Sequence, residues 1–121
     1  MPSTLVSVII AVYNGCDTIV DCLNSVVKQT CLTQSGQVNV EICLHDDCST
    51  DSTRDIVRDW WHTVGAKTNV DVNLHVSATS QKNPKGPGFG RNAAIVNSKG
   101  DYICILDADD WMYPTRIEHQ L

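Results

Sequence analysis

The 121-residue sequence lacks the long hydrophobic run that a membrane-spanning helix requires. Its first apolar stretch, residues 5–12, is too short to cross a bilayer. No Lys or Arg precedes this stretch, as one would in a secretory signal. We therefore expect a cytoplasmic protein without a membrane segment. The sequence is not basic either, and its formal net charge of -5 does not indicate a nucleic-acid surface.

Several motifs of cofactor sites and hydrolases are also missing. None of the six cysteines forms a Cys-x-x-Cys pair, and Cys43 and Cys104 lie in apolar runs. This favours reduced, packed thiols over disulfides. The four histidines have no metal-binding spacing, and no nucleophile stands near a histidine in a recognisable pattern. The stretch 86–90 does not continue into a dinucleotide-binding motif, because Arg91 stands where the third glycine is needed.

What is present is the composition of one soluble globular domain. Hydrophobic residues make up 42% of the chain and charged residues 19%, which excludes a disordered or fibrous segment. Residues 114–121 have the pattern of the first turns of a helix, with no stop signal after them. We therefore expect residues 1–121 to be the N-terminal part of a domain that is incomplete at its C-terminus.

Four stretches have the pattern of β-strands. Residues 6–12, 40–44 and 102–106 are almost continuously apolar, which is typical of strands buried on both faces of a parallel sheet. Residues 70–76 alternate apolar and polar side chains, which indicates a strand that is exposed on one face or lies at an edge.

Helical periodicity separates these strands. Apolar residues recur at helical spacing over residues 17–30 and 56–64, and Gly65 can end the second helix. The Gly- and Pro-rich stretch 83–90 is expected to lead as a loop into a third helix over 92–98. Alternating strands and helices predict an α/β fold, an α/β/α sandwich with a mostly parallel sheet.

Side chains that could bind a ligand follow three of the strands. Tyr13 follows the first, Asp46 and Asp47 the second, and the acidic group 107–110 the fourth. Parallel sheets place ligands at the carboxyl ends of their strands, so all three groups should converge at one edge. An aromatic ring can stack on a base, and a carboxylate can accept a hydrogen bond from an imide N–H or from ribose hydroxyls. The pattern predicts a nucleoside site.

The acidic group adds a candidate metal site. Asp107 and Asp109 are separated by one residue, so on an extended strand end both side chains point the same way. Carboxylate oxygens favour Mg²⁺ or Mn²⁺. Such a cation would neutralise a diphosphate and improve it as a leaving group. Group transfer from a nucleoside diphosphate is therefore predicted.

Each of these features has a structural alternative. Asp46 and Asp47 could be turn formers or helix N-caps, and Tyr13 could be a packing residue. At the level of function, the alternative to an enzyme is a non-catalytic module that binds a nucleotide or a partner.

Five blocks of sequence stand out, and they are VSVIIAVYN over 6–14, SVVKQT over 25–30, HDDCSTDST over 45–53, GRNAA over 90–94 and GDYICILDADD over 100–110. In this order they resemble the signature of the family 2 glycosyltransferases, which have the GT-A fold. The resemblance covers nearly the whole chain, but only the nucleotide-sugar-binding part of the family's domain.

The resemblance implies transfer of a sugar from a UDP-sugar donor to an acceptor hydroxyl with inversion, assisted by Mn²⁺ or Mg²⁺. It also implies a role for six residues. Ala11 and Tyr13 would line the uracil pocket, Asp47 would contact the uracil, Arg91 would lie near the diphosphate, Asp107 would approach the ribose, sugar or metal, and Asp109 would bind the metal.

Two departures from the family bear on the base pocket: Cys48 stands where a Gly is usual, and Ala11 where Thr or Pro is common. The family's catalytic base is expected beyond Leu121, which implies that the 121 residues alone are inactive. Residues 83–92 and 111–116 further resemble a eukaryotic subgroup, the β-1,3-N-acetylglucosaminyltransferase-like proteins, associated with galactosylation of queuosine in tRNA. That likeness implies galactosyl or N-acetylglucosaminyl transfer, with tRNA as the acceptor.

Overall fold

The chain folds around one four-stranded sheet. The structure is a computed structural model, and it describes residues 3–33, 37–68, 72–80 and 82–121. The strands are β1 (Thr4–Val12), β2 (Val38–Asp46), β3 (Val72–Ala78) and β4 (Tyr102–Ile105). Their order in the sheet is β3-β2-β1-β4, and each of these neighbouring pairs is parallel.

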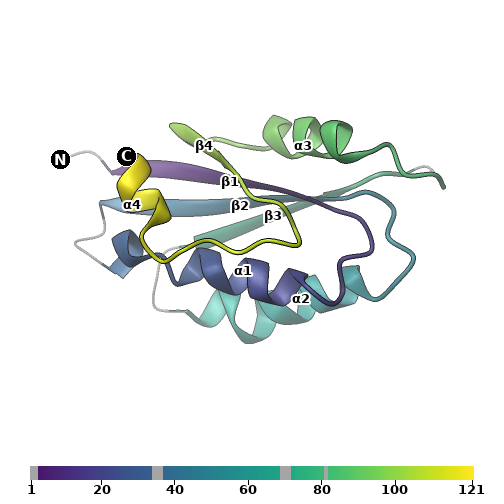
Figure 1. Cartoon of the computed structure of the whole chain (residues 1–121), viewed down its shortest axis with the longest axis horizontal. Coiled ribbons are helices and arrows are strands. Elements are labelled where there is room, and N and C mark those ends of the chain that lie inside the picture. Colours follow the sequence, from purple (N-terminus) through teal and green to yellow (C-terminus); the bar gives the residue numbers. More distant parts are fainter. Residues whose placement is uncertain (1–2, 34–36, 69–71, 81) are drawn as a thin grey trace.

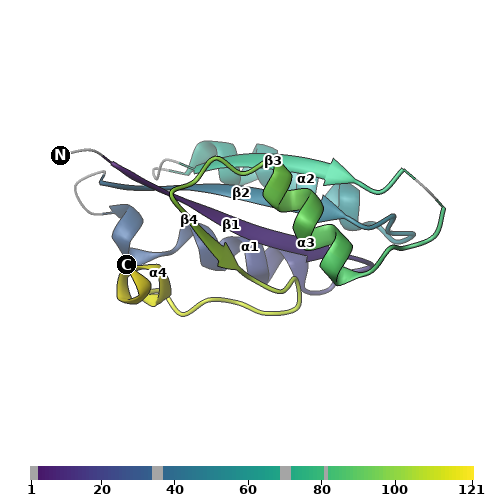
Figure 2. The ribbon, with the colours of Figure 1, turned by 90° about the horizontal axis from the view of Figure 1, so that it is seen from above.

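Helices cover both faces of the sheet (Figures 1 and 2). The helices α1 (Ile19–Val27) and α2 (Thr53–Thr63) lie on one face, and α3 (Pro87–Val96) lies on the other. A short α4 (Arg116–Gln120) and two 3₁₀ turns, η1 (Thr30–Thr33) and η2 (Gly65–Lys67), complete the described elements. This is the predicted α/β/α sandwich. None of the described helices has the length and apolar character needed to cross a membrane.

The two central strands are buried on both faces, as their apolar runs predict. Alternate side chains of β1 point to opposite faces. Val8 and Ile10 join the large apolar core beneath α1 and α2. Ile9 instead joins Cys43 and Ala94 in a small apolar cluster beneath α3. The sheet is therefore the middle layer that carries both helical layers.

The two edge strands, β3 and β4, differ in how well they match the expectations from the sequence. β3 lies at an edge, as predicted. Val76, one of its alternating apolar residues, is exposed, and Val70 falls outside the described residues. The prediction that β4 is buried was wrong. Only Cys104 of that strand is buried, while Ile103 and Ile105 are exposed. Within the described chain β4 pairs with β1 alone, because it is the last strand on its side of the sheet.

Helix α3 begins earlier than the sequence suggested. The Gly- and Pro-rich stretch was expected to be a loop, but Pro87 already occupies the first turn of the helix. Proline is well suited there, because its φ is helical and the N–H that it lacks would have no partner in the first turn. Gly86 precedes it with a φ of 96°, a value that favours glycine. The loop therefore ends at Gly86, and the helix ends at Val96 rather than Ser98.

Candidate nucleotide and metal site

A cleft of about 520 Å³ opens at the carboxyl ends of β1 and β4. Five residues that the sequence singled out line it: Ala11, Tyr13, Arg91, Asp107 and Asp109. β1 pairs with β2 on one side and with β4 on the other, so the strand order reverses direction at β1. Open α/β sheets bind ligands at such a switch point. The cleft therefore lies where the topology favours ligand binding.

A narrow slot of about 200 Å³ adjoins the cleft and contains the sixth residue, Asp47. Ala11 and Tyr13 line both spaces, and Pro84 and Pro87 provide further walls of the slot. Tyr13 is 49% exposed, so its ring is not a core packing residue. Asp47 and the acidic group thus line two adjoining spaces that share the Tyr13 wall, rather than one undivided cleft. A slot walled by a ring and prolines suits a flat, apolar-faced group.

The Asp47 carboxylate is buried and fully hydrogen bonded. The Lys85 amide donates to both of its oxygens at 2.9 Å, the Gly86 amide donates at 2.8 Å, and the Thr79 hydroxyl donates at 2.7 Å. Burial acts to raise the pKa of Asp47, but the bonds from Lys85, Thr79 and Gly86 outweigh it and leave that pKa below its ordinary value. Asp47 is therefore ionised at neutral pH and holds residues 84–86 beside the slot.

Asp46 has a different environment, although it is the neighbour of Asp47 in the sequence. Its carboxylate lies 2.6 Å from the guanidinium of Arg54 on α2 and accepts a hydrogen bond from the Ser49 hydroxyl at 2.5 Å. Asp46 is the last residue of β2 and Asp47 is the first residue after it, and the two carboxylates bind different partners. Asp46 is the turn former of the structural alternative.

The loops after β1 and β2 are tied together by residues 49–53. Asn14 Oδ1 accepts hydrogen bonds from the Thr50 and Asp51 amides at 2.8 and 3.3 Å, and the Asn14 amide donates to the Ser49 hydroxyl at 2.9 Å. The Gly15 amide donates to the Thr53 hydroxyl at 3.0 Å. The sequence analysis did not predict these hydrogen bonds between the two loops. The signal was the run of Ser, Thr and Asp, which favours loop and cap hydrogen bonds.

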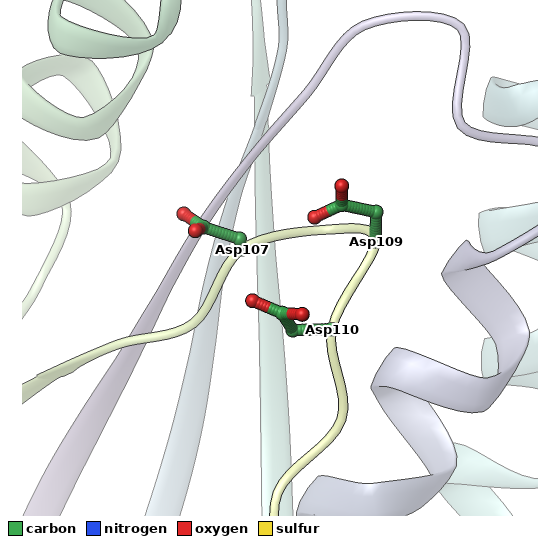
Figure 3. A group of neighbouring side chains, drawn as sticks. All are labelled: Asp107, Asp109 and Asp110. Atoms are coloured by element: carbon green, nitrogen blue, oxygen red, sulfur yellow. The ribbon is translucent and has the colours of Figure 1, made fainter.

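Asp107, Asp109 and Asp110 form a cluster of exposed carboxylates on one turn (Figure 3). One oxygen from each lies within 4.8 Å of the others. β4 ends at Ile105, so the extended geometry expected for Asp107 and Asp109 was wrong. Instead, the Asp110 amide donates to the Asp107 carbonyl at 3.0 Å and closes a turn, which adds Asp110 to the pair. Three close carboxylates repel one another, and their oxygens are the ligands that Mg²⁺ and Mn²⁺ prefer.

Arg91 reaches this turn from α3, across the cleft. Its Nη2 lies 2.8 Å from Asp107 Oδ1. The cleft therefore contains a guanidinium beside the acidic cluster, although both groups come from distant parts of the sequence. A guanidinium matches the geometry of phosphate oxygens. The arrangement can bind a diphosphate through Arg91 and through a cation held by the carboxylates.

Residues 7–121 match the model of the family described as glycosyl transferase family 2. The chain belongs to glycosyl transferase family 2. This confirms the family resemblance seen in the five sequence blocks, whereas the comparisons give no support to the queuosine subgroup.

Named relatives of this family 2 chain are bacterial enzymes. It is 36% identical to the UDP-Glc:α-D-GlcNAc-diphosphoundecaprenol β-1,3-glucosyltransferase WfaP of Escherichia coli, over 97% of this chain and 40% of that protein. It is 35% identical to the poly(ribitol-phosphate) β-N-acetylglucosaminyltransferase TarS of Staphylococcus aureus, over 88% of this chain and 16% of that protein. The chain therefore spans less than half the length of these relatives.

Solved structures confirm the GT-A arrangement of the family 2 chain. The crystal structure of S. aureus TarS 1–349 in complex with UDP-GlcNAc superposes with a TM-score of 0.73 at 31% identity, over 99% of this chain and 30% of that chain. The mannosyltransferase PcManGT from Pyrobaculum calidifontis, in complex with GDP-Man and Mn²⁺, gives a TM-score of 0.69 at 25% identity, over 94% of this chain and 30% of that chain.

Cys22 lies beneath the acidic turn of this family 2 chain and illustrates the state of its thiols. Burial, followed by the charges of Asp110, Asp109 and Asp107, raises the pKa of Cys22 to about 12. The sulfur is therefore a neutral thiol, and it donates to the Asp107 carbonyl at 3.6 Å. All six cysteines are unpaired, and four of them are buried, as the sequence predicted.

Proposed function

We propose that this chain binds the UDP part of a UDP-sugar together with a divalent cation, and that the protein transfers the sugar to an acceptor hydroxyl with inversion. One observation carries the proposal. An aromatic ring, a guanidinium and the carboxylates of Asp107 and Asp109 line one cleft at the switch point of the sheet, and Asp110 lies beside those two carboxylates. Each has a counterpart in a nucleoside diphosphate, namely a base, a diphosphate and the cation that accompanies it.

The two adjoining spaces suggest how the nucleotide lies. The base occupies the slot, with Tyr13 against its face and Ala11 on the wall, and Asp47 faces its imide edge. The diphosphate lies in the larger cleft, where Arg91 supplies positive charge. Asp107 lines the same cleft and faces the ribose, the sugar or the metal. The crystal structures of TarS with UDP and with UDP-GlcNAc support a uridine nucleotide for a chain of this family.

Asp107 and Asp109 are the proposed metal ligands, with Asp110 as an additional one. Three carboxylates on one exposed turn fit a hard divalent cation such as Mn²⁺ or Mg²⁺. When bound, that cation would stabilise negative charge on the diphosphate as a leaving group. The Mn²⁺ named with the related mannosyltransferase supports a metal for this fold. On cation binding Asp107 would exchange its bond to Arg91 for the metal, which frees the guanidinium for phosphate.

Titration calorimetry with UDP tests the site directly. We expect UDP to bind at least about tenfold more tightly in Mn²⁺ than in EDTA, and Asp109→Asn to remove most of that difference, since a lost charge-assisted interaction costs about 1.5–3 kcal/mol. The matched control is Asp59→Asn, an exposed carboxylate on α2 outside the site. Equal affinity for UDP in Mn²⁺, in EDTA and with Asp109→Asn would contradict the metal site.

The donor sugar and the acceptor are separate proposals. Galactose and N-acetylglucosamine are the predicted sugars, and tRNA queuosine is the predicted acceptor. The names of the relatives above mention other acceptors, so the tRNA acceptor rests on the sequence resemblance alone. Radiolabelled UDP-galactose and UDP-N-acetylglucosamine, offered to the protein with queuosine-containing tRNA, test these predictions. UDP binding without transfer to any acceptor offered would favour the non-catalytic binding module instead.

A further inference from the structure

A buried chain of hydrogen bonds leads from β3 to the Asp47 carboxylate. His45 Nδ1 lies 2.8 Å from the Ser77 hydroxyl, and His45 Nε2 lies 2.8 Å from the Thr79 hydroxyl. The Thr79 hydroxyl in turn lies 2.7 Å from Asp47 Oδ1. His45, Thr79 and Asp47 are all buried. One hydroxyl group therefore connects the buried imidazole to the candidate base-binding carboxylate.

The number of protons on these side chains determines which group donates in each of these hydrogen bonds. An ionised Asp47 can only accept, so the single proton of the Thr79 hydroxyl points to Asp47. Thr79 must then accept from His45, which places a proton on Nε2. The other ring nitrogen, Nδ1, lies 2.8 Å from the Ser77 hydroxyl, which can donate to it. Every member donates toward Asp47, and such aligned bonds strengthen one another.

The imidazole has little freedom to leave this position. The Phe89 ring meets it edge-on, with centroids 5.9 Å apart. A Cβ added at Gly90 would lie 3.4 Å from the imidazole Cδ2, so α3 closes over the ring. The register of the sheet places His45 opposite Ser77, which fixes the other end. A confined ring can hold the Thr79 hydroxyl in one orientation.

We infer that His45 and Thr79 are positioning residues that orient the Asp47 carboxylate to recognise an imide N–H, so that the slot selects uracil over cytosine. This inference rests on the proposed function. Uracil presents an N–H to the carboxylate, whereas cytosine presents a ring-nitrogen lone pair, which the carboxylate repels. The Lys85 amide is shared between both oxygens. A base N–H can take its place while Thr79 keeps Oδ1 fixed.

The first test measures the ratio of the dissociation constants of CDP and UDP in Mn²⁺. We expect Thr79→Val, which keeps the shape but removes the hydroxyl, to reduce the preference for UDP by about tenfold, the value of one hydrogen bond to a charged group. Thr79→Ser restores the hydroxyl and should recover the preference. Thr63→Val is the matched control, since that hydroxyl bonds only to a carbonyl on the exposed face of α2.

The second test changes the imidazole. His45→Gln keeps an N–H donor for Thr79 and should retain more of the UDP preference than His45→Leu, which has no donor. In the unaltered chain, nitrogen NMR of the histidine ring should show a protonated Nε2 and an unprotonated Nδ1. The Nε2 resonance should shift with UDP more than with CDP. This measurement needs no variant, so it stands even where a substitution prevents folding.

The outcomes distinguish a failure of the proposed function from a failure of the hydrogen-bond relay, which is the path from His45 through Thr79 to Asp47. If the unaltered chain binds neither nucleotide, the proposed function fails and the relay with it. If the unaltered chain prefers UDP while a folded Thr79→Val keeps the same preference, the relay alone is overturned. The opposite histidine tautomer would overturn it as well.

Discussion

Cys48 illustrates how one residue can carry strain beside the candidate site. Its φ of 55° is left-handed, a conformation that costs an L-residue about 1–2 kcal/mol and that glycine adopts freely. Cys48 stands where the sequence resemblance implies a usual Gly. We therefore expect Cys48→Gly to stabilise the fold by up to about 1 kcal/mol in urea unfolding, because part of the relief is offset by the entropy of glycine in the unfolded chain.

Two further variants at this position separate the backbone effect from the thiol. Cys48→Ala removes the sulfur, which lies 3.6 Å from the Lys82 carbonyl, and keeps the strain. Cys48→Val adds a β-branched side chain, which tolerates this φ worst, and should destabilise by about 1–3 kcal/mol. A free energy of unfolding that is the same for Gly, Ala and Val would show that the backbone at position 48 is unstrained.

At the scale of elements, α3 depends on a close approach to β1. A Cβ added at Gly90 would lie 2.9 Å from the Ala11 Cβ, whereas one added at Gly88 would meet nothing within 4 Å. Gly90→Ala should therefore push α3 from the sheet and destabilise the fold by about 1–3 kcal/mol. Since Arg91 follows directly, UDP binding should weaken too.

Gly88→Ala is the matched control within the same helix. It should stabilise the fold by up to about 1 kcal/mol, because alanine is the better helix former and the site is open. Thermal melting and calorimetry with UDP check both variants. Equal effects at positions 88 and 90 would mean that α3 does not pack closely on β1.

At the scale of the whole molecule, carboxylates tie together segments that are distant in the sequence. The buried Glu41 on β2 accepts hydrogen bonds from the Ser7 hydroxyl and the Lys99 amide, both at 2.5 Å. Burial acts to raise the pKa of Glu41, but the bonds from Lys99 and Ser7 leave it lowered. The bond from the Thr53 hydroxyl is the main reason that the pKa of Asp51 falls to about 2.

These lowered pKa values predict acid sensitivity. A carboxyl group with a lowered folded-state pKa contributes stability that is present above its unfolded pKa, about 4, and is lost as pH falls through the folded value. The free energy of unfolding should therefore be steady from pH 7 to about 5 and fall between about pH 4 and 2. Glu41→Gln should lower stability at pH 7 and flatten that decline. Urea unfolding at stepped pH measures both, and a pH-independent stability would contradict the assignment.

The order of the elements, the α/β class and most of the candidate site could be predicted from the amino-acid sequence. Local periodicity is sufficient for this, because a strand buried on both faces must be apolar along its length, as residues 6–12 are. Parallel strands also end at the same edge, so Tyr13, Asp47 and Asp107 could be assigned to one region before their positions were known. Their individual roles stay predictions.

Only the tertiary structure could show which groups touch. Asp46, at the end of β2, pairs with Arg54, whereas Asp47, just after the strand, binds Thr79 and Gly86. Asp110 joins the acidic cluster because the chain turns after β4. The exposure of β4 follows from its place at the sheet edge. The relay from His45 through Thr79 depends on β3 lying beside β2. The hydrogen bonds between His45 and Thr79 join residues far apart in the sequence, and the acidic cluster depends on the shape of one turn. Local sequence patterns encode neither strand order nor turn shape.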